Sequence, residues 1–93
     1  MYTLEWTPSF IKAAKRFAKR HPELKQKTAI ALLALEQDPF QPSLKLHGLE
    51  GKLKGVCAIS ITYSYRITLT LKISEHVITL LNIGDHNDVY RRE

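Results

Sequence analysis

Four side chains in this sequence are of types that transfer protons, bind phosphate or position a substrate: His47, Arg66, His86 and Tyr90. Histidine can take or give a proton near neutral pH, and the planar guanidinium group of arginine can bind two phosphate oxygens at once. Cleaving RNA needs a base, an acid and a cation at the phosphorus, because the substrate's own 2′-hydroxyl is the nucleophile. These residues could therefore cleave RNA without a metal ion.

Each of these residues also has a structural alternative. His47 lies in a glycine-containing loop and could be an exposed loop histidine, and the same holds for His86. Arg66 could pair with a carboxylate on a neighbouring strand. For Tyr63 and Tyr65 we expect packing on the sheet rather than stacking on RNA bases.

Other kinds of active site find no support in the motifs. The chain has no glycine-rich phosphate loop, no paired-cysteine zinc pattern and no His-Glu-x-x-His helix. Its four histidines are widely spaced, and Cys57 lies between Val56 and Ala58 on an apolar segment typical of a core. We therefore expect no metal site, no cofactor and no covalent mechanism.

Composition indicates an ordinary globular protein. The chain has 93 residues, of which 44% are hydrophobic and 25% charged, and we expect one domain over residues 1–93. No apolar run approaches the length needed to span a bilayer, and the first residues lack the pattern of a secretory signal. A single cysteine excludes an internal disulfide. We expect a cytoplasmic protein.

Positive charge is concentrated in two places. The net charge is +5, from 14 basic and 9 acidic residues. One group falls within residues 12–27, and the other lies mid-chain at Lys45, Lys52 and Lys54. Such groups favour RNA or an acidic protein partner, although a solvated surface is the alternative.

The elements that must position these side chains can be read from the hydrophobic pattern. Residues 2–6 alternate as a strand does, and Thr7-Pro8 is typical of a helix start. His21-Pro22 ends this helix and opens a second, which stops at Asp38-Pro39.

After a loop over residues 39–55, the pattern changes to a period of two. It predicts strands over residues 57–61 and 66–72, joined by a turn at 62–64. Residues 77–83 suit a strand buried on both faces, and residues 86–90 remain as a tail. The resulting order is strand, helix, helix and three strands. This order predicts an α+β fold with the helices on one face of a mostly antiparallel sheet.

Three segments together resemble the RelE/ParE superfamily of toxins from toxin–antitoxin systems, in particular its YafQ-like and RelE/StbE-type branches. They are residues 46–55 (LHGLEGKLKG), 61–67 (ITYSYRI) and 82–90 (NIGDHNDVY). The similarity extends over nearly the whole chain. It implies a compact toxin fold, cleavage of mRNA in the ribosomal A site, and neutralisation by a cognate antitoxin.

The resemblance also implies roles for particular residues. His86 corresponds to a histidine proposed as acid or base, Tyr90 to an aromatic residue that positions substrate, and His47 to a partner in proton transfer. Arg66 corresponds to an arginine that stabilises phosphate. Lys52 and Lys54 correspond to a basic loop, to which we add Lys45 as a candidate RNA-binding residue.

Two positions depart from the YafQ-like pattern. Ser60 and Ser64 stand where those members have a histidine and an aspartate, which leaves open which group is the acid and which the base.

The sequence thus predicts a metal-independent endoribonuclease that cleaves mRNA on the ribosome. Its partners would be mRNA, the ribosome and a cognate antitoxin, with which it forms a hetero-oligomer, and it would not bind membranes. Two alternatives remain open: a ParE-like poison of DNA gyrase, and a catalytically weak antitoxin-binding module.

Overall fold

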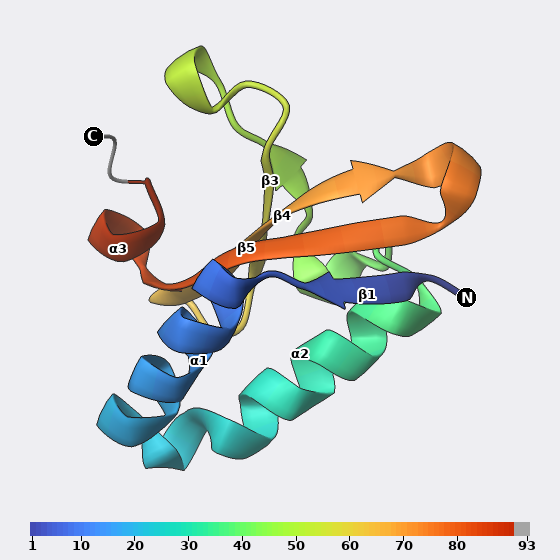
Figure 1. The fold of residues 1–93 in the computed structure, drawn as a ribbon. Coiled ribbons are helices and arrows are strands. Elements are labelled where there is room, and N and C mark those ends of the chain that lie inside the picture. The colour runs from blue at the N-terminus through green and yellow to red at the C-terminus, as the bar shows by residue number, and fades with distance from the viewer. Residues whose placement is uncertain (91–93) are drawn as a thin grey trace.

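The computed structural model describes residues 1–90, apart from the side chain of Lys52. It contains one five-stranded sheet and three α-helices (Figure 1). The strands are β1 (Thr3–Trp6), β2 (His47–Gly48), β3 (Cys57–Ser60), β4 (Tyr65–Lys72) and β5 (Val77–Asp85), and the helices are α1 (Pro8–Arg20), α2 (Lys25–Gln37) and α3 (His86–Tyr90). None of these helices combines the length and the apolar character that crossing a membrane requires.

The strand order in the sheet is β1-β5-β4-β3-β2. β1 pairs in parallel with β5, and the other neighbours are antiparallel. Helices α1 and α2 cover one face of the sheet (Figure 1). The predicted α+β class with helices on one face is confirmed. The predicted order was incomplete in two respects, because it lacked the two-residue strand β2 and gave residues 86–90 as a short tail rather than as the helix α3.

Helix α1 begins where the Thr7-Pro8 pair predicts. The Thr7 hydroxyl oxygen accepts the backbone N–H of Phe10 at 3.1 Å, and the same hydroxyl donates to the backbone oxygen of Leu80 at 2.7 Å. Proline at the first helical position costs no hydrogen bond. Thr7 therefore both caps α1 and attaches it to β5.

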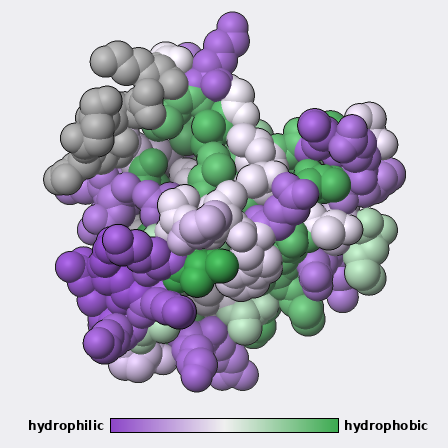
Figure 2. All heavy atoms as spheres, viewed as in Figure 1, coloured by the Kyte–Doolittle hydropathy of each residue, from purple (hydrophilic) through white to green (hydrophobic). Residues whose placement is uncertain are grey.

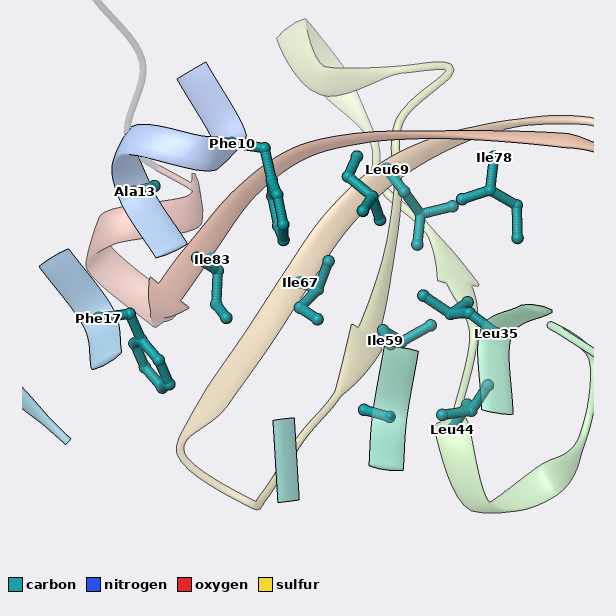
Figure 3. Packing of buried hydrophobic residues seen from close by; sticks show 12 residues of the cluster. Phe10, Ala13, Phe17, Leu35, Leu44, Ile59, Ile67, Leu69, Ile78 and Ile83 are labelled. Atoms are coloured by element: carbon teal, nitrogen blue, oxygen red, sulfur yellow. The ribbon is translucent and has the colours of Figure 1, made fainter. Parts of the chain in front are cut away.

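The core lies between the two long helices and the sheet (Figure 3). Phe10 and Leu35 from the helices and Ile59, Ile67 and Leu69 from the strands are fully buried. The predicted burial of the last strand on both faces was wrong. Within residues 77–83, the side chains on the helix side are buried, whereas those on the opposite side are only half-buried, since neither α1 nor α2 covers that face.

A β-bulge at Thr68/Leu69 adjusts the register between β4 and β5. Ile67 pairs with Ile83, and Leu69 pairs with Leu80, so β5 carries one extra residue between these pairs. Both Leu80 and Ile83 therefore face the core although they are three positions apart. As a result, the residues next to Ile83, Asn82 and Gly84, face the open side of the sheet.

Replacing the cap of α1 tests its double role. We expect Thr7→Ala to lower the free energy of unfolding by about 1–2 kcal/mol, because it removes the helix cap and the bond to β5. Thr7→Ser keeps a hydroxyl and should lose much less. Denaturant unfolding of the two variants would measure the difference, and equal stabilities would contradict the role of the hydroxyl.

Candidate active site

The sheet face opposite α1 and α2, called here the open face, carries two of the predicted site residues. Strand pairing places His47, Ala58 and Thr68 in one row across β2, β3 and β4. Ser60, Arg66 and Gly84 form the next row across β3, β4 and β5. His47 and Arg66 therefore project from the same face of strands that are about 10 Å apart.

A cavity of about 460 Å³ opens on this face. One wall is the loop around the short 3₁₀ helix Gly51–Leu53, which rises from the sheet, and the other is α3 (Figure 1). Its lining residues are His47, Leu49, Glu50, Leu53, Arg66, His86 and Tyr90. The four residues that the sequence singled out for catalysis thus line a single cavity, although they come from separate parts of the chain.

A backbone carbonyl orients the ring of His47. The Nδ1 atom lies 3.0 Å from the backbone oxygen of Lys45. A carbonyl oxygen can only accept a hydrogen bond, so Nδ1 carries the proton and Nε2 of the neutral ring has a free lone pair. Lys45 adopts a left-handed conformation with φ 53°, which turns the chain just before β2.

Arg66 is held by its neighbour across the strands. Its Nη1 group donates a hydrogen bond to the hydroxyl oxygen of Ser60, the residue that pairs with it in β3. The alternative for Arg66 was an ion pair with a carboxylate on a neighbouring strand. No carboxylate within residues 1–90 forms such a pair with it. Its charge and its remaining N–H groups are thus available to an anion in the cavity.

Helix α3 presents the other two residues. His86 and Tyr90 are one turn apart, and their rings meet edge to face with centroids 4.3 Å apart. Val89 is buried and anchors the helix on the sheet side. A segment of five residues cannot form a stable helix alone, so α3 depends on contacts with the rest of the molecule.

Several hydrogen bonds supply those contacts. Asp85 Oδ1 accepts the backbone N–H of Asp88 at 2.9 Å, and Asp88 Oδ2 accepts the backbone N–H of Asp85 at 3.2 Å. The side-chain amide of Asn82 donates to the backbone oxygen of Asp88 at 3.1 Å. This reciprocal pair of hydrogen bonds resembles a capping box. The spacing of three residues between Asp85 and Asp88 is visible in the sequence and could have predicted the start of the helix.

Gly84 allows α3 to approach β5 closely. A Cβ atom at this position would lie 2.5 Å from Cβ of Asp88, which is far inside van der Waals contact. Glycine is therefore required here by close approach rather than by an unusual backbone angle. Asn82, Gly84, Asp85 and Asp88 position His86 and Tyr90, and sequence analysis assigned none of them to the site.

The predicted RNA-binding lysines occupy different places. Lys45 lines a second cavity that adjoins the first and shares His47 and Arg66 with it. Lys54 is exposed and lines neither cavity. The side chain of Lys52 lies outside the described part of the structure.

The N-terminal basic cluster lies elsewhere. Most of its side chains belong to α1, where Figure 2 shows a strongly hydrophilic surface, and Lys25 and Lys27 belong to the start of α2. Arg16 and Arg20 line a separate cavity of about 240 Å³ between α1, β5 and α3, together with Asn82 and Asp88. This group is therefore not part of the cavity that contains His47.

The two neighbouring tyrosines have different environments. Tyr65 packs on Phe17 and His21, with ring centroids 5.4 and 4.6 Å apart, as expected for a sheet residue. Tyr63 is 92% exposed, so its predicted packing on the sheet was wrong. It lies in the turn between β3 and β4, where no other element covers it.

Cys57 packs against the core, and burial raises the pKa of its thiol, which disfavours the reactive thiolate. Within residues 1–90, no three side chains of His, Cys, Asp or Glu are arranged to bind a metal ion.

Substitution of two glycines tests the positioning of α3. Gly84→Ala must displace Asp88, so we expect large NMR shift changes for His86 and Tyr90 and small ones in α2. Gly48→Ala is the matched control, because a Cβ atom there meets nothing within 4 Å. Similar shifts at His86 in both variants would show that Gly84 does not position the helix.

The architecture is shared with solved structures of bacterial toxins, although no family model and no curated protein matches the sequence. YafQ from Escherichia coli BL21(DE3) is 21% identical, with a TM-score of 0.73 over 98% of this chain and 100% of that chain. A YoeB/ParE toxin from Agrobacterium tumefaciens is 20% identical, with a TM-score of 0.74 over 92% of this chain and 99% of its own. YafQ in the E. coli DinJ–YafQ complex is similar to the same degree, at 22% identity and a TM-score of 0.71 over 98% of this chain and 100% of that one. The chain therefore has the fold of RelE/ParE-type toxins, as the resemblance implied.

Proposed function

We propose that this protein is the toxin of a type II toxin–antitoxin system and cleaves mRNA without a metal ion. The observation that carries the proposal is the convergence of His47, Arg66, His86 and Tyr90 on one cavity of the open face. These groups can supply a base, an acid and a cation for phosphodiester cleavage. The shared fold with YafQ and the YoeB/ParE toxin supports the assignment to toxins.

The order of the strands suggests how the residues are placed around the scissile phosphate. Arg66 lies on β4, between β5, which leads to His86, and β2, which carries His47. An in-line displacement needs the base and the acid on opposite sides of the phosphorus. This arrangement would place the scissile phosphate over Arg66, with one histidine on each side.

The hydrogen bond to Lys45 favours His47 as the base, because it leaves Nε2 with a free lone pair. Nε2 would take the proton of the 2′-hydroxyl, and the 2′-oxygen would attack the phosphorus. Arg66 would stabilise the charge on the phosphorane, and His86 would protonate the leaving 5′-oxygen. The products would be a 2′,3′-cyclic phosphate and a 5′-hydroxyl end.

Tyr90 contacts the His86 ring edge to face and lines the same cavity. In the proposed reaction, Tyr90 orients this ring and packs against the bound nucleotide. Lys45, with its positive charge at the edge of the site, would hold a neighbouring phosphate of the RNA.

We also expect a cognate antitoxin. A DinJ–YafQ complex from E. coli and a YoeB–YefM complex from Staphylococcus aureus have toxin chains of the same fold. The net charge of +5 suits an acidic partner that would cover the cavity, in a hetero-oligomer formed in the cytoplasm. Translated mRNA on the ribosome is the proposed substrate.

Mapping of RNA 5′ ends tests the function in cells. Within minutes of inducing this chain without an antitoxin, we expect new 5′-hydroxyl ends within translated regions. A His86→Ala variant should produce none, because it lacks the proposed acid. Growth arrest without new ends would overturn the nuclease and favour a protein target such as DNA gyrase.

Cleavage of RNA by the purified protein tests the role of His47 as the general base. We expect His47→Ala to lower the cleavage rate by about 10²- to 10⁴-fold, the usual cost of losing a general base. The control is His76→Asn, since His76 is exposed, lies at the far end of β4 and has a left-handed backbone that asparagine tolerates. An unchanged rate for His47→Ala would exclude His47 as the base.

A further inference from the structure

A second cavity extends the candidate active site along the open face. Its volume is about 410 Å³, and it shares His47 and Arg66 with the first cavity. Its other lining residues are Ser43, Lys45, Ser60, Ile61, Thr62 and Tyr63. Because the two cavities meet at the proposed position of the scissile phosphate, they form one groove. The proposed reaction gives roles to His47, Arg66 and Lys45 in the second cavity but none to Tyr63.

Tyr63 stands at the far end of this groove. It belongs to the turn at residues 61–64, where Ile61 N–H donates to Tyr65 O at 2.9 Å and Ser64 N–H donates to Thr62 Oγ1 at 3.3 Å. These bonds fix the backbone of the turn, while the Tyr63 side chain is 92% exposed. A large aromatic ring gains free energy when it is covered, so this ring is suited to a ligand.

The charge of the second cavity favours an anionic ligand, and the exposed ring of Tyr63 beside it favours a nucleic acid among such ligands. Lys45 and Arg66 line it, and none of its lining residues within the described chain is acidic. The hydroxyl groups of Ser43 and Thr62 add hydrogen-bonding partners near the aromatic ring. A cation beside an exposed aromatic ring is the combination with which proteins bind single-stranded nucleic acids.

We propose that the second cavity binds the nucleotide adjacent to the scissile phosphate, with its base stacked on Tyr63 and its phosphate held by Lys45. This inference rests on the proposed function. The RNA strand runs along the groove, from α3 past Arg66 to the turn between β3 and β4. Because every base has a flat face, Tyr63 contributes affinity and placement of the strand with little dependence on base identity.

Binding of a short RNA oligomer tests the subsite. The oligomer is one that the wild-type protein cleaves at a single mapped position, made uncleavable by a 2′-deoxy substitution there. We expect Tyr63→Ala to weaken binding about tenfold to a hundredfold, the usual effect of losing one stacked base. Tyr63→Phe keeps the ring and should bind as the wild type does.

An abasic nucleotide identifies the stacked base. Placed in turn on each side of the cut, it should remove the difference in binding between wild type and Tyr63→Ala at one position only. Ile73→Ala is the control, because Ile73 is also exposed and apolar but lies beyond the opposite end of β4. It should bind as the wild type does.

The outcomes separate the two proposals. If the wild type cleaves RNA and Tyr63→Ala binds the oligomer equally well, the subsite is overturned while the nuclease stands. In that case the exposed ring of Tyr63 is better explained as a contact for a protein partner. If the wild type produces no new RNA ends in cells and neither binds nor cleaves purified RNA, the nuclease and the subsite are both overturned.

Discussion

The pairing of β4 with β5 is the interaction on which the rest of the structure depends. It extends from Tyr65 opposite Asp85 to Lys72 opposite Val77, with one bulge at Thr68/Leu69. Because side chains alternate along a strand, a slip by one residue would exchange the two faces of β4. In the observed register, Ile67 enters the core and Arg66 faces the open side. One strand pair thus builds the core and presents the cation of the candidate site.

The two faces of the sheet have different physical roles. The helix face is covered by α1 and α2 and contains the large buried side chains. The open face is covered only in part, by α3 and the loop around residues 51–53, both of which are short. Short elements with few buried contacts are the least stable parts of a protein. The walls of the cavity are therefore the parts that depend most on local hydrogen bonds, such as those between Asp85 and Asp88.

The fold alone does not decide what the site does, since one fold can support several activities. The activity depends on particular side chains, and Ser60 and Ser64, which depart from the YafQ-like pattern, are examples. Ser60 accepts a hydrogen bond from Arg66 and helps to hold its guanidinium group on the open face. Ser64 donates its backbone N–H to Thr62 within the turn that presents Tyr63. In the proposed enzyme, therefore, these positions support phosphate binding and strand placement, while proton transfer belongs to His47 and His86.

The sequence by itself determined the local features of this protein. Thr7-Pro8 and His21-Pro22 predicted where α1 begins and ends, and the apolar alternation predicted β3, β4 and the turn between them. These signals act within a few residues, through capping, proline geometry and hydrophobic periodicity. Only the tertiary structure decided that β1 lies beside β5, that Ser60 holds Arg66, and that Tyr63 is exposed while Tyr65 is partly buried against α1. The physical reason is that strand pairing and burial join segments far apart in the chain, and their energies depend on the whole packed arrangement.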